Sequence, residues 1–221
     1  MRQGNAFREL LLTTLVVALM PFAVEAVSSS PPDGRPRIVA FGDSLTAGLG
    51  VQADESYPAL LQRKLDDLQY PYRVINAGVS GDTTAGGLRR VPWILNNKPE
   101  VVILELGAND GLRGLEIEQT KNNLRQIVEG LRAAGATVVL AGMKLPPNYG
   151  QEYTTRFEAI YPSLAQEYSL SLIPFFLEGV GGTSSLNQAD GIHPTKDGYK
   201  IIVEQVLKTL QPVLSKSPYK H

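Results

Sequence analysis

The chain of 221 residues contains no cysteine and only two histidines. Without cysteine there is no disulfide and no lipid-modified cysteine, so packing alone must hold the folded protein together. Long runs of lysine or arginine are also missing, and the formal net charge at pH 7 is −1, which argues against a nucleic-acid partner. One histidine, His221, is the last residue. Any chemistry that needs an imidazole in the body of the chain therefore depends on His193.

The composition is that of an ordinary globular protein, with 43% hydrophobic and 19% charged residues. A chain of this length can bury a sizeable core. No internal repeat and no second zone of composition is visible, so we expect a single folded domain.

The first residues differ from the rest. Arg2 and Arg8 precede a short apolar run at 10–20, and small residues follow near Ala26. This pattern predicts a secretory signal peptide at 1–26 that is cleaved. The apolar run is shorter than the roughly 20 residues that a membrane span needs, so an uncleaved anchor is the weaker interpretation. Residues 27–36 then form a flexible lead-in.

Five short apolar runs alternate with helical patterns from residue 37 onward. The runs are rich in β-branched residues and are continuous rather than alternating, as expected for strands buried on both faces. They are "RIVAFG" (37–42), "YRVINAG" (72–78), "EVVILELG" (100–107), "TVVLAGM" (137–143) and "LSLIPF" (170–175). The alternation predicts one parallel sheet covered by helices on both sides, in a domain at 37–214 followed by a tail at 215–221.

The helical patterns between these runs each place apolar residues on one face. The four sets are Leu60, Leu61, Leu65 and Leu68; Leu124, Ile127, Val128 and Leu131; Phe157, Ile160, Tyr161 and Leu164; and Ile202, Val206 and Leu210. Pro162 falls inside the third set, where it should kink or end the helix.

Small, hydroxyl, amide and acidic residues gather where the predicted strands end. "GDSLTAG" (42–48), "GVSGDTT" (78–84) and "GANDGLRG" (107–114) follow the first three strands, and "DGIHP" (190–194) follows the fifth. Ligands of parallel sheets bind beyond the carboxyl ends of the strands. We therefore expect these four segments to form one site.

Ser44, His193 and Asp190 together have the residue types of a catalytic triad. A serine hydroxyl is a weak nucleophile until a base takes its proton, and an acid next to the imidazole fixes its tautomer. Asp190 stands three residues before His193, close enough to reach Nδ1 and to leave Nε2 facing a serine. Each residue also has a plainer interpretation: Asp43 or Ser44 can cap a helix, and Asp-Gly pairs favour turns.

Gly81, Asn109 and Ser44 are candidates for an oxyanion hole. Gly81 can present its backbone N–H because it has no side chain, Asn109 can donate from its amide, and the Ser44 backbone N–H would be the third donor. The plainer alternatives are a helix start capped by Asp82 or Thr83, and an ordinary turn at "GAND". Four such segments at the correct strand ends are harder to explain as turns.

These residues resemble the SGNH or GDSL-type hydrolases, whose Ser, Gly, Asn and His match Ser44, Gly81, Asn109 and His193. The resemblance is nearest to the secreted bacterial thioesterase I, lysophospholipase L1 and arylesterase branch, and it covers residues 37–214. It rests on "SGDTT", "ELGANDGLRG", "LPPNYG", "IYPSLA", "PFFLEGV" and "DGIHP" in this order. Ala108 is a departure, since glycine is frequent there in the branch, and it puts only the loop conformation in doubt.

The resemblance implies a three-layer α/β/α, flavodoxin-like fold with a five-stranded parallel sheet. It implies hydrolysis of aryl esters, lysophospholipids and acyl-CoA through an acyl-enzyme on Ser44, without metal or cofactor, by a monomer in the periplasm of a Gram-negative bacterium. By analogy, four residues would contact the acyl chain: Leu112, Leu115, Leu145 and Pro146. Contacts from the Gly- and Ser-rich loop at 180–190 are not carried over.

Other functions remain open at this point. A polysaccharide or small-molecule O-acetyl esterase would use the same fold and the same residues. A metal-dependent phosphoesterase could use a ligand set of Asp43, Asn109, Asp190 and His193, although one histidine is few for such a site. A non-catalytic ligand-binding module is the third alternative, but "GDSLTAGLG" lacks the spacing and the lysine of a phosphate-binding loop. An α/β-hydrolase is disfavoured because G-x-S-x-G is absent.

Overall fold

The computed structural model describes residues 34–217, and the predicted signal peptide and most of the predicted lead-in lie outside them. The strands are β1 (Arg37–Gly42), β2 (Arg73–Gly78), β3 (Val101–Glu105), β4 (Thr137–Ala141) and β5 (Ser171–Ile173). The α-helices are α1 (Ser44–Ala47), α2 (Tyr57–Asp67), α3 (Thr84–Asn96), α4 (Ala108–Leu112), α5 (Ile117–Ala133), α6 (Gln151–Glu158), α7 (Ile160–Tyr168) and α8 (Lys196–Leu214). Two 3₁₀ turns, η1 (Ala53–Glu55) and η2 (Pro147–Tyr149), lie in the connections.

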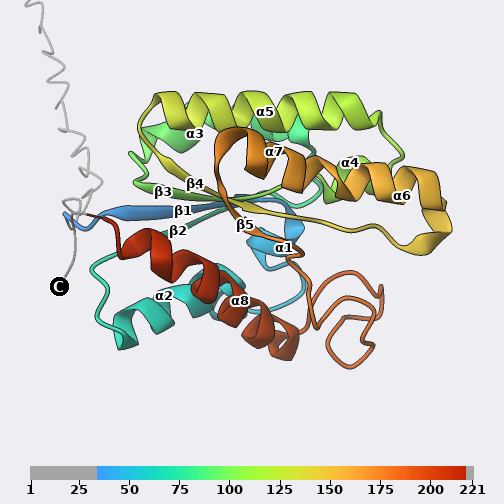
Figure 1. Ribbon diagram of the computed structural model, residues 1–221. Helices are drawn as coiled ribbons and strands as arrows, with labels where there is room; N and C mark the ends of the chain where they lie inside the picture. The colour runs from blue at the N-terminus through green and yellow to red at the C-terminus, as the bar shows by residue number, and fades with distance from the viewer. Residues whose placement is uncertain (1–33, 218–221) are drawn as a thin grey trace, which may run out of the picture. The chain divides into compact units, whose positions relative to one another are not determined.

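The five strands form one parallel sheet in the order β2-β1-β3-β4-β5. Helices α3, α5 and α7 cover one face, while α2 and α8 pack together on the other (Figure 1). This is the flavodoxin-like strand order. The predicted three-layer α/β/α fold is confirmed.

The predicted burial of the strands holds for the middle of the sheet and fails at its edge. Every residue of β3 is buried, and so is β1 apart from its first residue. In β2, however, Arg73 and Asn76 are exposed, and Val74 and Ile75 are only half-buried. Among residues 34–217, β2 pairs with β1 alone, so no other described strand lies along its outer side. An apolar run does not say which strand lies at the edge.

Two predicted helix faces, on α5 and α8, are buried as expected. The face predicted for α2 is only partly correct: Leu61 and Leu65 are fully buried, Leu60 is half-buried, and Leu68 is 46% exposed. The helix ends at Asp67 and the next residue but one, Gln69, has a positive φ of 59°. Leu68 therefore leaves the helical face and turns to solvent.

The third predicted face is split between two helices, α6 and α7, which meet at Ala159. Pro162 lies in the first turn of α7, where a missing N–H leaves no hydrogen bond unmade. Phe157 and Tyr161 still share a buried face, with ring centroids 5.8 Å apart. The Tyr161 hydroxyl donates to the carbonyl of Leu106 at 3.1 Å, so this face supports the chain just after β3.

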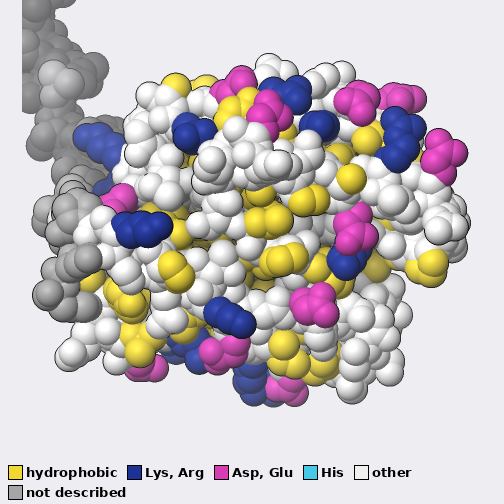
Figure 2. Space-filling view, in the orientation of Figure 1, with side chains coloured by type: hydrophobic (Ala, Val, Ile, Leu, Met, Phe, Trp, Pro, Cys, Tyr) yellow, Lys and Arg dark blue, Asp and Glu magenta, His cyan; other side chains and the backbone are white. Residues whose placement is uncertain are grey.

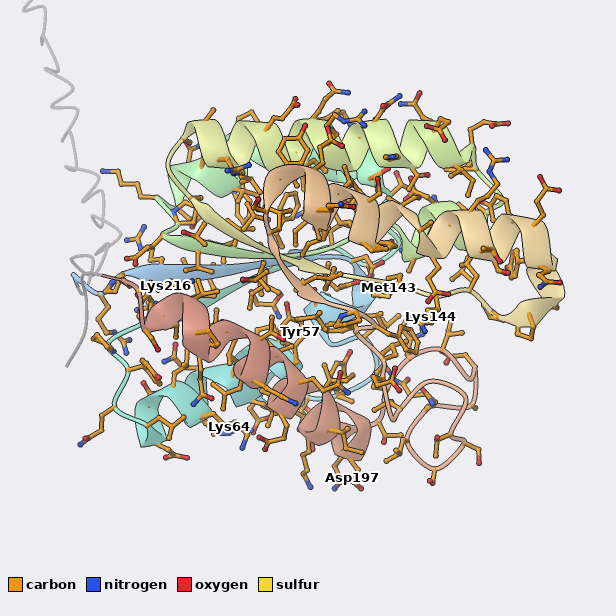
Figure 3. All side chains as sticks on the ribbon, in the orientation of Figure 1. Tyr57, Lys64, Met143, Lys144, Asp197 and Lys216 are labelled. Atoms are coloured by element: carbon orange, nitrogen blue, oxygen red, sulfur yellow. The ribbon has the colours of Figure 1, made fainter. Side chains whose placement is uncertain are left out.

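The surface carries charges of both signs without a large patch of either on the face in Figure 2. Some charges join elements: Lys64 on α2 lies 2.5 Å from Glu204 on α8, and Figure 3 shows Lys64 on the outer side of α2. None of the helices between residues 34 and 217 combines the length and the apolarity that a membrane crossing demands.

Candidate active site

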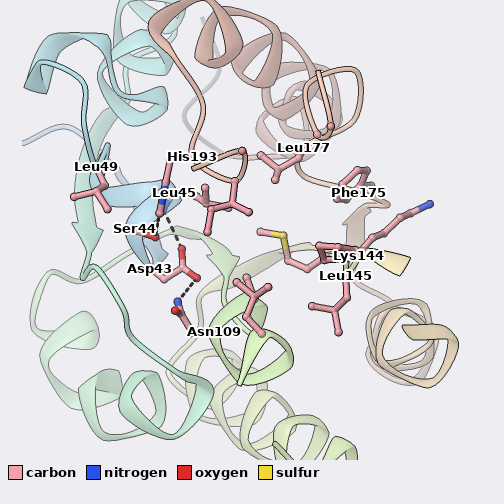
Figure 4. Close-up of a pocket in the computed structure, with 18 of the residues that line it drawn as sticks. Asp43, Ser44, Leu45, Leu49, Asn109, Lys144, Leu145, Phe175, Leu177 and His193 are labelled. Carbon is pink, nitrogen blue, oxygen red and sulfur yellow. Dashed lines mark hydrogen bonds between the residues drawn. The ribbon is translucent and has the colours of Figure 1, made fainter. Parts of the chain in front are cut away.

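The strand order reverses direction at β1, and this reversal places the site. β2 lies on one side of β1 and β3 on the other, so a crevice opens between the segments that follow β1 and β3. Ser44 comes directly after β1 and Asn109 after β3. Figure 4 shows both facing one pocket together with His193. The predicted meeting of the strand-end segments is confirmed.

Ser44 opens the four-residue helix α1 and is 7% exposed. Asp43 caps this helix, since its Oδ1 accepts the Leu45 backbone N–H at 3.0 Å. The plainer interpretation of Asp43 as a cap is therefore correct as well. The turn is tight because Gly42 and Gly78 have no side chains: a Cβ on Gly42 would lie 2.0 Å from Thr46 Oγ1.

His193 links Ser44 to Asp190. Its Nε2 lies 2.9 Å from Ser44 Oγ and its Nδ1 lies 2.7 Å from Asp190 Oδ2. A carboxylate only accepts hydrogen bonds, so Nδ1 carries the proton and Nε2 is free to accept one. The sequence interval of three residues between Asp190 and His193 produces the contact that was expected.

Asp190 is ionised and held in a turn. Its Oδ1 accepts the backbone N–H groups of Ile192 and His193, both at 3.0 Å, and Gly191 has a φ of +75°. The backbone hydrogen bond from His193, with those from Ile192 and the imidazole, lowers the pKa of Asp190 to about 2. The Asp-Gly turn and the acid–imidazole pair are thus the same structure.

The three residues predicted to supply oxyanion donors, Ser44, Gly81 and Asn109, all line the pocket. One N–H of Asn109 donates to Asp43 Oδ2 at 2.9 Å, which leaves the other free. Gly81 has a φ of +77°, and its carbonyl accepts from the Arg113 guanidinium at 2.8 Å.

A buried polar network anchors Asn109 from behind. The neighbouring Asp110 is 2% exposed and accepts from the backbone N–H and the hydroxyl of Thr84, at 2.8 and 2.5 Å. Asn123 on α5 in turn donates to the Thr84 hydroxyl at 3.0 Å. Burial raises the pKa of Asp110. This network was not predicted from the sequence, although Asp110 directly follows Asn109.

The alternative cap positions at the start of α3 are also resolved. Thr83, rather than Asp82, is the N-cap, and its hydroxyl accepts the Gly86 backbone N–H at 3.3 Å. Asp82 instead pairs with Arg90 at 2.6 Å. The segment that carries Gly81 is therefore a helix start and a border of the pocket at once.

The pocket is a cavity of about 650 Å³. Of the four predicted acyl contacts, Leu112, Leu145 and Pro146 line it, but Leu115 does not. Leu115 is 41% exposed, and its carbonyl accepts from the Tyr153 hydroxyl at 2.7 Å. The sequence analysis missed several other apolar lining residues: Leu49, Met143, Phe175, Leu177 and Ile192.

Segments from both halves of the chain form the walls. Met143 and Lys144 follow β4 and line the pocket, and Figure 3 shows the two residues close to each other. Lys144 pairs with Glu158 at 3.0 Å and lies 5.4 Å from the Phe175 ring centroid, so its charge is turned toward the rim. Gly181 and Gly182 of the Gly- and Ser-rich loop also border the cavity.

The residues considered as metal ligands do not form a ligand cluster. Asp190 bonds His193, whereas Asp43 bonds Leu45 and Asn109. Within residues 34–217, no three His, Asp or Glu side chains are placed to hold a metal ion together.

Comparison with known proteins decides the family. The profile of the GDSL-like Lipase/Acylhydrolase family matches residues 40–201, from β1 into α8. The chain belongs to this family. It is 47% identical over 178 residues to "Esterase TesA" of Pseudomonas aeruginosa, covering 80% of this chain and 89% of that one.

Two further comparisons agree with the GDSL-like assignment. Thioesterase 1/protease 1/lysophospholipase L1 of Escherichia coli is 40% identical over 216 residues, which is 97% of this chain and 98% of that one. The crystal structure of esterase EstA from Pseudoalteromonas superposes with a TM-score of 0.78 at 35% identity, covering 81% of this chain and 99% of that one. The chain is a GDSL-type hydrolase with the fold that the resemblance implied.

Proposed function

We propose that this GDSL-type hydrolase is a serine esterase that cleaves acyl esters and thioesters through an acyl-enzyme on Ser44. The proposal rests on a chain of two hydrogen-bond contacts: Ser44 Oγ lies 2.9 Å from His193 Nε2, and His193 Nδ1 lies 2.7 Å from Asp190 Oδ2. A serine, a base and an orienting acid in this arrangement perform acyl transfer on unrelated folds.

The reaction follows from this geometry. Ser44 Oγ attacks the substrate carbonyl while His193 Nε2 takes the hydroxyl proton, and Asp190 stabilises the imidazolium. His193 then returns the proton to the leaving alcohol or thiol as its bond to the carbonyl carbon breaks. Water enters, gives a proton to His193 and attacks the acyl-enzyme, and Ser44 leaves with that proton. The steps use only groups of this chain and consume one water.

The negative charge on the carbonyl oxygen needs donors in the tetrahedral intermediate. The Ser44 and Gly81 backbone N–H groups and the free N–H of Asn109 are the proposed donors. Their common border with the pocket supports this role. Removing one such donor typically lowers turnover on the order of 10²–10³-fold.

The cavity supports an acyl chain longer than acetyl. Its lining is largely apolar, with Leu112, Leu145 and Pro146 among the residues beyond Ser44. An acetyl group would leave most of the 650 Å³ unfilled. We therefore favour aryl esters, lysophospholipids and acyl-CoA over O-acetylated sugars, in line with the names esterase, thioesterase and lysophospholipase of its relatives.

Replacing the nucleophile tests the proposal. Ser44→Ala should fold normally, lose p-nitrophenyl ester hydrolysis and fail to react with a fluorophosphonate probe. Ser163→Ala, which changes a serine on α7, is the matched control and should keep both properties. Near-normal hydrolysis by Ser44→Ala would rule out the mechanism, and a wild-type protein that resists the probe would favour a binding module.

The cellular setting is part of the proposal. We expect the 1–26 segment to direct export to the periplasm and to be removed there, and the mature enzyme to work as a monomer on small-molecule or lipid esters without a cofactor. Mass spectrometry of the exported protein and its elution volume in size-exclusion chromatography test these points. An intact N-terminus or a dimeric elution volume would contradict them.

A further inference from the structure

The base and the nucleophile come from very different parts of the fold. Ser44 directly follows the central strand β1, whereas His193 belongs to the long connection between β5 and α8, which is made mainly of turns. Their contact at 2.9 Å joins residues 149 positions apart. Because turns have little internal stiffness, the distance between the two groups depends on what holds this connection against the nucleophile turn.

Gln188 binds the segment that carries His193. Its backbone N–H donates to the His193 carbonyl at 2.7 Å, and its side-chain Nε2 donates to the Pro194 carbonyl at 3.0 Å. Two consecutive carbonyls of this segment are therefore bound by one residue. Gln188 itself is half-buried and belongs to the Gly- and Ser-rich loop at 180–190.

The same side-chain amide also reaches the turn that follows Ser44. Gln188 Nε2 donates to the Leu49 carbonyl at 2.7 Å, across 139 positions of the chain. The Leu49 backbone N–H in turn donates to the Ser44 carbonyl at 3.1 Å. A continuous set of hydrogen bonds thus runs from Ser44 through Leu49 and Gln188 to the backbone of His193.

Gly50 leaves the space that the Gln188 amide occupies. Its φ is +80°, and a Cβ there would lie 2.0 Å from Gln188 Oε1. The amide is therefore packed directly against the backbone of the turn after α1. Any side chain at position 50 would displace it.

We propose that Gln188 is a positioning residue that holds the His193 segment against the nucleophile turn and so sets the distance from His193 Nε2 to Ser44 Oγ. The proposal rests on the proposed function, since it takes His193 as the base for Ser44. Gln188 lies outside the lining of the pocket, so it acts through His193 rather than on the substrate.

Gln188→Glu tests the two donated bonds while it keeps the shape of the side chain. A carboxylate only accepts hydrogen bonds, so it would face the Leu49 and Pro194 carbonyls without a donor. For p-nitrophenyl esters, kcat should fall roughly 10²-fold, the cost that a misplacement of about 1 Å can have. KM should change little, because the substrate contacts remain.

Gln62→Glu is the matched control. Gln62 on α2 is also half-buried and donates from Nε2 to a backbone carbonyl, that of Tyr72, at 3.0 Å. Tyr72 precedes β2, at the end of the sheet opposite the pocket. This variant should lower the free energy of unfolding and keep the wild-type kcat. An unchanged kcat in Gln188→Glu, or an equal fall in Gln62→Glu, would overturn the proposal.

A second pair of variants displaces the Gln188 amide without changing Gln188. Gly50→Ala and Gly135→Ala both place alanine at a positive φ, +80° and +88°, so they carry similar backbone strain. A Cβ on Gly135 meets nothing within 4 Å, whereas a Cβ on Gly50 meets Gln188. We expect kcat to fall at least about tenfold in Gly50→Ala alone, by misplacement of the base. Equal kcat values in the two variants would overturn the proposal.

A double-mutant cycle shows whether Gly50 acts through Gln188. Gln188→Ala removes the amide that Gly50→Ala displaces, so the double variant should have nearly the kcat of Gln188→Ala. Losses that multiply would overturn the proposal. Urea unfolding identifies the variants that are folded, and the cycle decides the question if Gln188→Glu does not fold.

These experiments distinguish the positioning role from the proposed function. Hydrolysis that survives in Ser44→Ala would refute the proposed function itself. A Ser44→Ala protein without activity, together with wild-type kcat in folded Gln188→Glu, would refute the role of Gln188 alone.

Discussion

Three carboxyl groups of the site differ in charge because their surroundings differ. Asp190 is bound by two backbone N–H groups and the imidazole, and its pKa is about 2. Asp43 is buried, which raises its pKa to about 6. Glu105 is fully buried, which raises its pKa well above its usual range. Burial and hydrogen bonding thus give the same functional group a different pKa at each of the three positions.

The raised pKa of Asp43 predicts an acid limit of activity. Esterase kcat should fall as the pH drops through about 6, because protonated Asp43 no longer accepts from Asn109. Asp43→Asn should show low kcat at every pH, reduced on the order of 10²-fold as for one lost oxyanion donor. Initial rates with p-nitrophenyl esters across pH test this. A variant with wild-type kcat would show that the charge of Asp43 is unimportant.

The raised pKa of Asp43 also predicts that the ionised form, which activity needs, destabilises the folded protein. Asp43 has a higher pKa folded than unfolded, so its favourable contribution is present below about pH 4 and lost as the pH rises through about 6. At about pH 8 the buried charge should cost about 3 kcal/mol, since each pKa unit of the rise from 3.8 to about 6 corresponds to about 1.4 kcal/mol. Asp43→Asn should therefore raise the free energy of unfolding in urea at about pH 8 and have little effect at about pH 4. A destabilised variant at about pH 8 would contradict this.

At the residue scale, the sequence predicted Ser44, His193 and Asp190 because hydroxyl, imidazole and acid are recognisable by type and spacing. Glu105 was not recognised, because it ends an apolar strand and looks like a strand terminus. Its full burial beside the Asp43 backbone N–H results from tertiary packing, and burial of a charged residue type is not visible in a sequence.

Among the elements, the short helix α1 owes its position to glycine. Gly42 and Gly78 stand side by side at the ends of β1 and β2, and α1 lies against them. A Cβ on Gly78 would come 2.2 Å from the Ala47 backbone nitrogen. Because that contact is with backbone, the helix itself would have to move.

Gly78→Ala should therefore displace the nucleophile. We expect it to lower the free energy of unfolding by about 1–3 kcal/mol, as overpacking does, and to slow fluorophosphonate labelling of Ser44. Gly130→Ala inside α5 is the control: its Cβ would lie 3.3 Å from a flexible Val91 methyl, and helix propensity favours alanine by about 1 kcal/mol. Equal labelling rates in the two variants would count against the role of Gly78.

Two predictions that were wrong concern a strand and a helix rather than single catalytic residues. Strand β2 was expected to be buried on both sides and is an edge strand, and Leu68 was placed on a helix face that ends one residue earlier. Apolar periodicity identified the type of each element correctly. It could not give the neighbour of a strand or the residue at which a helix stops.

At the scale of the whole molecule, one sheet gathers segments that are far apart in the chain. The pocket takes residues from Asp43 to His193, and its acyl side is built from the segments after β3, β4 and β5. The structure places Leu145 in this wall and leaves Leu115, three residues beyond Leu112, outside it. Position in the fold, rather than apolar character, decides which leucine can meet a substrate.

The different positions of Leu145 and Leu115 predict how each residue affects the preference for acyl-chain length. Leu145→Ala should lower kcat/KM about fiftyfold for an octanoyl ester, since each of the three apolar carbons removed forfeits about 0.8 kcal/mol of burial, and leave acetate hydrolysis nearly unchanged. Leu115→Ala should alter neither. Rates with p-nitrophenyl acetate and octanoate test the pair. Equal losses for both substrates in Leu145→Ala would indicate a distorted site instead of a lost acyl contact.

The sequence by itself determined the class of fold and the chemistry. Strand–helix alternation predicts a parallel sheet, and a serine, a histidine and an acid three residues earlier at strand ends predict acyl transfer, because both predictions depend on local pattern and residue type. Only the tertiary structure decided that β2 is an edge strand, that Leu115 lies outside the pocket and that Glu105 is fully buried beside Asp43. These depend on which distant segments exclude water from one another, and burial is a property of the packed molecule.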